Sequence, residues 1–224
     1  MHRVLFVTLI AAALLIAPAA SAETYVGMRL LGDGTFNGDL EPIPDAGFYT
    51  AREFVVGFGD EIQGEFGFGF DTVSTEYKGD DEEHPDRDFD YFDKVSYKLM
   101  TLSLAGFYPI QGGAGENRID VGLRFRYLSA SWEDETDYYG RDDDLEKNEY
   151  GVSGWSIGPV MRAQWRCCND RIGIGPEIGI KYGSYTKTQT YTYPGSEPSD
   201  SPDHSISGWT LDYSLRFDFF FDPK

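Results

Sequence analysis

The sequence predicts an all-β protein, an eight-stranded antiparallel up-and-down β-barrel, and three observations lead to this prediction. Apolar and polar residues alternate with a period of two in eight segments, which is typical of strands with one apolar face. Long and short connections alternate between these segments. Beyond residue 22 there is no run of about 18 apolar residues. No helix is therefore expected to span a membrane, whereas a closed barrel can do so because it pairs its backbone groups internally.

The first 22 residues predict a secretory signal peptide. His2 and Arg3 precede an apolar run over residues 4–17, and Ala20, Ser21 and Ala22 form an A-x-A cleavage site. We therefore expect a mature chain that starts at Glu23 and forms one domain over residues 23–224. Loss of Arg3 changes the formal net charge from −19 to −20. A chain this acidic is not expected to bind nucleic acid, whose phosphates need a basic surface.

The last segment, residues 209–221, shows the alternation most clearly. Seven apolar residues share one face: Trp209, Leu211, Tyr213, Leu215, Phe217, Phe219 and Phe221. A thirteen-residue strand is roughly 40 Å long, and a tilt of about 40° leaves roughly 30 Å of height, close to the apolar thickness of a bilayer. Its other face carries Asp212, Arg216 and Asp218, which require a wet or ion-paired interior.

The other seven segments repeat this pattern and are predicted as strands over 24–31, 51–59, 63–73, 94–108, 118–131, 152–166 and 171–191. In the third, Phe66 and Phe68 alternate with Gly67 and Gly69, and glycine on the inner face suits a narrow barrel. The fourth is ambiguous because its apolar residues shift from odd to even positions, so we expect a β-bulge near Leu99.

The predicted connections differ in length on the two sides of the barrel. The long ones are 32–50, 78–93, 133–151 and 194–206, and the short ones are 60–62, 109–117 and 167–170. Both termini fall on the short side. Long outer loops opposite short periplasmic turns are typical of even-stranded transmembrane barrels.

With eight such segments, this loop asymmetry and a closing strand that ends at Phe221, the chain resembles the small eight-stranded Gram-negative outer-membrane proteins, the class of the OmpA transmembrane domain, OmpX and the opacity-type adhesins. The resemblance implies a place in the cell outer membrane, with membrane lipid, lipopolysaccharide and the barrel-insertion machinery as partners. In that family the final strand commonly ends the chain on an aromatic residue, whereas here Asp222, Pro223 and Lys224 follow.

The inner face is predicted to hold a network of ion pairs that fills the lumen, because an eight-stranded barrel is about wide enough for its own side chains and pairing lowers the cost of burying charge. The predicted members are Arg29, Glu53, Glu65, Asp71, Asp120, Arg124, Arg126, Arg162, Arg166, Glu177, Lys181, Asp212, Arg216 and Asp218. A narrow pore and a catalytic carboxylate are alternative interpretations of the same residues.

The acidic outer segments are interpreted first as solvated, mutually repelling loops. Divalent cations that bridge to anionic lipopolysaccharide are the functional alternative. Asp86, Asp88 and Asp90 resemble the opening of a calcium loop, but Tyr91 stands where the turn glycine belongs, so this is a weak candidate metal site.

Enzymatic chemistry is not expected. After cleavage only His84 and His204 remain, both next to prolines or serines in predicted loops, and no Gly-rich phosphate loop or G-x-S-x-G motif is present. Cys167 and Cys168 are adjacent, a spacing that strains a disulfide between them. We interpret them as structural or incidental, with a redox role or inter-chain pairing as the alternative. No cofactor is expected.

The sequence therefore favours a non-enzymatic outer-membrane barrel with a structural or surface-interaction role. Two alternatives remain open: a narrow porin-like channel for small solutes, and a secreted lipocalin-like barrel that binds an apolar ligand inside. The orientation of the strands separates the last alternative from the others, because a lipocalin would turn Phe66, Phe68 and Phe217 inward and Arg124 and Glu177 outward.

Overall fold

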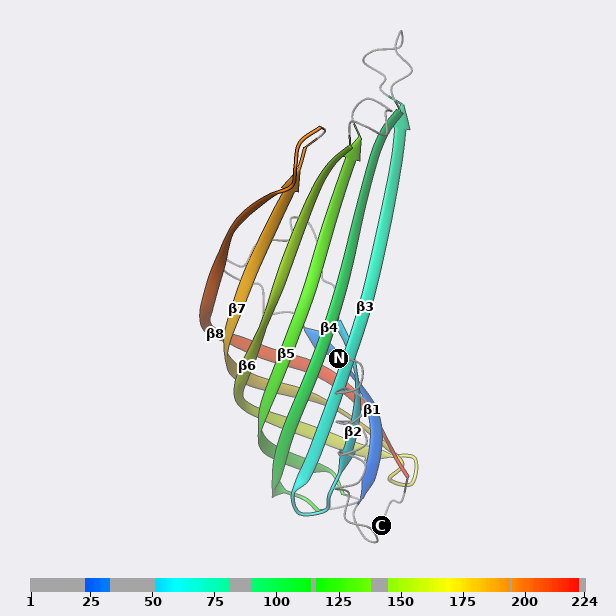
Figure 1. Ribbon diagram of the computed structural model, residues 1–224. Helices are drawn as coiled ribbons and strands as arrows, with labels where there is room; N and C mark the ends of the chain where they lie inside the picture. Colours follow the sequence, from blue (N-terminus) through cyan, green and yellow to red (C-terminus); the bar gives the residue numbers. More distant parts are fainter. Residues whose placement is uncertain are drawn as a thin grey trace, which may run out of the picture.

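The computed structural model describes residues 23–32, 51–80, 90–113, 116–137, 145–193 and 195–221. Its strands are β1 Thr24–Gly32, β2 Ala51–Phe58, β3 Gln63–Asp80, β4 Asp90–Gln111, β5 Arg118–Asp137, β6 Leu145–Cys167, β7 Ile172–Thr192 and β8 Ser199–Phe220. They pair in chain order, and β8 closes the ring onto β1 (Figure 1). The prediction of an all-β, antiparallel, up-and-down ring of eight strands is confirmed. Within the described ranges, no helix has the length and apolar character to cross a membrane.

The side chains of each strand alternate between the interior and the outer surface of the ring. On β5, Leu123 and Phe125 are 54% and 41% exposed, whereas Arg124 and Arg126 between and beside them are 4% and 5% exposed. On β8, Phe217 is exposed and both Arg216 and Asp218 are buried. The barrel therefore carries its charges inside and its large apolar side chains outside, the reverse of a water-soluble protein.

The strands differ in length more than the sequence indicates. β1 and β2 have 9 and 8 residues, whereas β3 to β8 have 18 to 23. The parts of the chain next to 81–89 and 138–144, which the alternation assigned to long loops, are strand in the structure. The wall formed by β3 to β8 consequently continues far past the ends of β1 and β2 as a curved sheet (Figure 1).

The expected bulge near Leu99 is wrong. The register between β3 and β4 runs without interruption from Gln63↔Phe107 to Asp80↔Asp90, and the irregularity of β4 lies between Pro109 and Gln111. Leu99 points inward and is 5% exposed. It belongs to an apolar cluster inside the barrel, at the end near the long extensions, made of Tyr97, Leu99, Leu128, Ala130, Val152 and Tyr185. The apolar residues of β4 lie on the inner face up to Leu99 and on the outer face from Met100 to Leu104, which explains the apparent change of period.

Glycines make room for the largest inward side chains. A Cβ at Gly57 would lie 1.9 Å from Cζ of Tyr25, so the Tyr25 ring occupies the space that a side chain on β2 would need. A Cβ at Gly67 would lie 2.3 Å from Oγ of Ser103 and 2.8 Å from the carboxylate carbon of Glu53. The narrow interior therefore depends on glycine where a large polar group crosses it.

Candidate functional site

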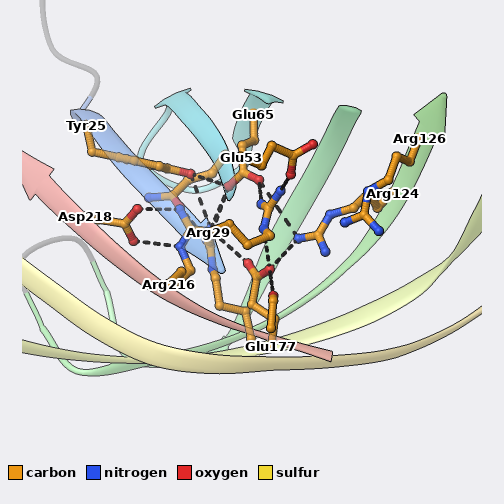
Figure 2. A network of polar contacts seen from close by, with 12 residues as sticks. Tyr25, Arg29, Glu53, Glu65, Arg124, Arg126, Glu177, Arg216 and Asp218 are labelled. Atoms are coloured by element: carbon orange, nitrogen blue, oxygen red, sulfur yellow. Dashed lines mark hydrogen bonds and ion pairs between the residues drawn. The ribbon is translucent and has the colours of Figure 1, made fainter. Parts of the chain in front are cut away.

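Arg29 lies at the centre of the interior and pairs with three carboxylates from three different strands. Its guanidinium donates hydrogen bonds to Glu53 of β2, to Glu65 of β3 and, across 2.7 Å from Nε to Oε2, to Glu177 of β7 (Figure 2). The side chains of all four residues are at most 1% exposed. Through the interior, Arg29 thus ties β1 to β2, β3 and β7.

Glu177 is the second hub. It accepts hydrogen bonds from Arg124 Nη2 at 2.7 Å, from Arg216 Nη1 at 2.8 Å and from the Ser214 hydroxyl at 2.9 Å, in addition to Arg29 (Figure 2). Arg216 also pairs with Glu65 and Asp218, each at 2.7 Å. Three arginines therefore converge on one buried carboxylate, and each of them contacts further carboxylates.

A second layer lies toward the short-turn end of the barrel. Arg162 pairs with Asp120 at 2.7 Å, and its guanidinium carbon lies 4.0 Å from the centre of the Phe107 ring. Its Nη1 donates to the Tyr25 hydroxyl at 3.2 Å. Arg118 also pairs with Asp120, at 2.6 Å. This layer fills the interior with stacked guanidinium and aromatic groups.

The network extends toward both ends of the barrel. At the short-turn end, Arg166 pairs with Glu23 at 2.7 Å and lies 3.1 Å from the centre of the Phe220 ring. At the other end, Asp212 pairs with Arg126 at 3.0 Å and with Lys181 at 3.6 Å. Nε and Nη2 of Arg126 are buried without a hydrogen-bond partner. The apolar cluster around Leu99 lies beyond this end of the network.

The structure brings thirteen of the fourteen predicted lumen residues into buried or partly buried ion pairs and sets one apart. Asp71 is half-buried, and its carboxylate accepts a hydrogen bond from the Thr72 backbone N–H at 2.9 Å. It lies beyond Glu53↔Gly69, the last pair described between β2 and β3. Asp71 therefore sits where the described wall of β2 has ended, which accounts for its exposure.

Four of the interior residues were missed by the sequence analysis: Tyr25, Gln63, Phe107 and Arg118. Arg118 and Gln63 have the same parity as Asp120 and Glu65 two residues along, so strict alternation would have found both. Gln164 donates to Asp218 at 2.6 Å. The alternation also places Tyr25 and Phe107 on the inner face, with the parity of Arg29 and Ser103, but aromatic residues are easily misassigned because they also occur on the apolar outer face.

Burying this many charges requires close pairing. Moving one ion out of water into a protein interior costs several kcal/mol, and the cost is offset only where the partners are close and the remaining polar atoms are hydrogen-bonded. Among the described residues, every strand except β4 supplies a charged member of the network. β4 supplies the small or aromatic residues Thr101, Ser103 and Phe107. The arrangement is suited to filling and locking the barrel.

The outer surface carries an apolar band between two rows of aromatic residues. Trp155, Tyr182 and Trp209 are adjacent on β6, β7 and β8, with ring centres 6.3 and 5.5 Å apart. Trp165 and Phe219 lie ten residues further along β6 and β8, which for a strand tilted by about 40° is a height of roughly 25 Å. Exposed serines, Ser153 and Ser207, come directly beyond the first row.

The extended sheet beyond this band is polar outside and aromatic inside. On its outer face Lys147 pairs with Glu133 at 3.0 Å and with Glu149 at 2.6 Å. The hydrogen bonds that the Lys147 ammonium donates, first to Glu149 and then to Glu133, raise the pKa of Lys147, and the one that Glu133 accepts lowers the pKa of Glu133. On the inner face the rings of Trp132 and Tyr150 lie 4.6 Å apart.

The weak candidate metal site falls largely outside the described residues, which exclude Asp86 and Asp88 and give only the backbone of Asp90. In the part of the chain that the structure describes, no group of three His, Cys, Asp or Glu side chains could hold a metal ion. Cys167 and Cys168 are exposed and free. A hydrogen bond with Cys168 raises the pKa of the Cys167 thiol.

Fold and site together define a closed eight-stranded barrel with an ion-paired interior and an apolar exterior. No model of a protein family matches the sequence, and no curated protein sequence is similar to it. Among solved structures, the chain is similar to a major outer membrane protein from Thermus thermophilus, with 14% identity, a TM-score of 0.49 and coverage of 90% of this chain and 100% of that chain.

Proposed function

We propose that the protein is a non-enzymatic outer-membrane β-barrel whose lumen is closed by its own ion pairs. One observation carries the proposal: large apolar side chains such as Phe54, Leu123 and Leu211 are 54% to 63% exposed, while Arg29 and Arg216 are fully buried. Lipid is the surrounding in which this arrangement is stable, because acyl chains accept the apolar face and neighbouring strands of a closed ring pair their backbone groups with one another. The predicted signal peptide supplies the route of export.

A closed lumen supports a structural or surface-interaction role over transport. A solute would have to part the contacts of Arg29 and Arg216 with Glu65 and Glu177, whose side chains are at most 1% exposed. It would also have to pass the apolar cluster around Leu99. The alternative proposal, a narrow porin-like channel, requires this layer to open. The lipocalin-like alternative has no support in the orientation of the strands.

We propose that the extended sheet is the surface that meets partners outside the cell. Its carboxylates project beyond the aromatic row formed by Trp155, Tyr182 and Trp209. A shallow cavity of about 270 Å³ lies on it, lined among others by Lys98, Glu133 and Glu149. Acidic groups at the level of lipid headgroups suit divalent cations that bridge to anionic lipopolysaccharide. His204, on β8, is exposed and offers no buried base for catalysis.

The membrane proposal is tested by fractionating cells that express the full chain and by running the purified protein in detergent with and without heating. We expect to recover the protein in the outer-membrane fraction, and we expect it to migrate faster in the gel before heating than after. We also expect the part of the barrel on the short-turn side of the row Trp155, Tyr182 and Trp209 to resist external protease. Recovery of folded protein in the soluble periplasmic fraction would contradict it.

The closed lumen is tested separately by single-channel recording in planar bilayers. Wild-type protein is expected to show no conductance, and a variant that removes the central cations, Arg29→Ala with Arg216→Ala, is expected to conduct if it folds. Steady conductance of the wild-type protein at high protein concentration would instead establish the channel.

A further inference from the structure

Glu23, the residue after the predicted cleavage site, is held at the short-turn end of the barrel through its backbone and its side chain. Its carbonyl accepts a hydrogen bond from the Gly59 N–H at 3.0 Å, and its own backbone nitrogen donates to Asp60 Oδ1 at 2.8 Å. Its carboxylate accepts from Arg166 Nη2 at 2.7 Å and from Gln63 Nε2 at 3.4 Å. The residue is 0% exposed. A chain end is rarely fixed this completely.

The site also has unsatisfied polar atoms. Oε1 of Glu23 and Nε of Arg166 are buried without a hydrogen-bond partner. A buried polar atom left unpaired destabilises the fold, and most native structures avoid it. An amide nitrogen supplies one N–H, whereas an ammonium group supplies three donors and a positive charge. Of the two unpaired atoms only Oε1 of Glu23 is an acceptor, so the site can accept one more hydrogen bond than an internal peptide bond at Glu23 supplies.

We propose that cleavage between Ala22 and Glu23 creates an α-ammonium group that binds in this site as an ion pair with Asp60. Hydrolysis of that peptide bond by a leader peptidase consumes one water and leaves a carboxylate on Ala22 and an amine on Glu23, which takes up a proton at neutral pH. The inference rests on the proposed function, because export brings the chain to such an enzyme.

The charges around the new terminus are compatible with an added cation. The facing groups are the carboxylates of Glu23 and Asp60 and the guanidinium groups of Arg118 and Arg166, with Arg118 Nη1 3.3 Å from the Asp60 carbonyl. Arg166 is paired with Glu23 and Arg118 with Asp120. The acceptor of this hydrogen bond, the Asp60 carboxylate, already carries a charge, and the ammonium adds a positive charge on the donor, so that the contact becomes an ion pair. Processing thereby fastens the start of β1 to the turn between β2 and β3.

The first test is the amino-terminal sequence and intact mass of the protein extracted from outer membranes. A chain that starts at Glu23 is the expected result, and a folded, membrane-inserted barrel with any other first residue overturns the inference alone. An unprocessed chain in the soluble fraction would contradict the proposed function as well, so the two failures are distinguishable.

The second test compares unfolding in detergent, followed by gel mobility, for a chain that starts at Glu23 and one that starts with an added alanine. We expect Asp60→Asn to lower the midpoint temperature by several degrees in the first chain and by much less in the second. Glu61→Gln, which changes an exposed carboxyl group in the same turn, is the matched control and should change neither. Equal effects of Asp60→Asn in both chains overturn the inference.

A third measurement uses no substitution and so does not depend on a variant's folding. An α-ammonium ordinarily loses its proton near pH 8, and pairing with Asp60 moves this loss to higher pH. Its stabilisation is therefore complete below about pH 8 and disappears as the pH rises further. The chain that starts at Glu23 should be the more stable of the two at pH 7 and equal to the other at pH 11. A difference that persists unchanged at pH 11 contradicts an ion pair.

Discussion

Arg29 and Glu177 are 148 residues apart in the chain, yet Nε of the first lies 2.7 Å from Oε2 of the second in the middle of the barrel. Neither side chain is more than 1% exposed. β1 and β7 are not neighbours in the ring, so this contact crosses the lumen and does not follow the wall. It joins through the interior two strands that β8 separates in the wall.

Removal of the central cation is expected to be severe. Arg29→Ala leaves Glu53, Glu65 and Glu177 buried without their shared partner, and breaking a buried pair in this way costs about 3–5 kcal/mol. The free energy of unfolding in urea with lipid vesicles measures the loss. Lys98→Ala, which removes an exposed cation from the outer surface, is the control. A loss below about 1 kcal/mol for Arg29→Ala would contradict the role assigned to the network.

A charged substitution on the apolar outer band is expected to cost more stability in the middle of the band than beyond the aromatic row. Leu215 lies near the middle of the apolar band on β8 and is 42% exposed, so Leu215→Arg places a cation in acyl chains and should cost about 2–4 kcal/mol. Ser207→Arg, on the same strand beyond the aromatic row, should cost about 1 kcal/mol or less. Unfolding of both variants from lipid vesicles tests this. Equal costs would show that the band does not face lipid.

Glycine is expected to be indispensable at one position and replaceable at another. Gly57→Ala places a Cβ inside the Tyr25 ring, and such overpacking typically costs about 1–3 kcal/mol. Gly106→Ala, on the outer face of β4, meets no atom within 4 Å and should be neutral or stabilising. The midpoint temperature of gel-mobility unfolding compares them, and a reversed order would contradict the packing of Tyr25 against β2.

The ion pairs of the extended sheet are expected to contribute little and to depend on pH. The pKa of Glu133 is lowered, so the stability that its carboxylate contributes is present above about pH 4.3 and is lost as the pH falls. The pKa of Lys147 is raised, so the stability that its ammonium contributes persists below about pH 10.4 and is lost at higher pH. At pH 7, Lys147→Met should reduce hydrogen-exchange protection of β5 and β6 by about 1 kcal/mol or less. Lys98→Met is the control, and a loss that persists undiminished at pH 3 would contradict the pairing.

The fold could be predicted because the alternation of apolar and polar residues recurs in all eight strands. On β8 each apolar residue from Trp209 to Phe219 faces outward and each polar residue between them faces inward. The ambiguity on β4 arose because its apolar residues change face, from the interior at Tyr97 and Leu99 to the outer surface at Met100. The ends of the strands were missed for another reason: beyond the aromatic row both faces can be polar, so β3 and β5 continue through sequence that has the composition of a loop.

The members of the interior network could be predicted from parity, but their partners could not. Parity places Arg29, Arg124 and Glu177 inside, whereas the stagger of the strands around the closed ring decides which of them meet. The same stagger leaves Asp71 beyond the last pair described between β2 and β3. The role of Glu23 was invisible in sequence, because its contacts come from the turn at Asp60 and from Arg166, 143 residues away.

Because β1 and β2 are short, one edge of the extended sheet has no described neighbouring strand. Within the described chain, β8 before Tyr213 has a neighbouring strand on only one side, β7, and such a free margin is a template on which another polypeptide can add a strand. This margin carries Pro202 together with the exposed carboxylates Asp200 and Asp203. These residues disfavour the addition of a strand from a second polypeptide along this margin.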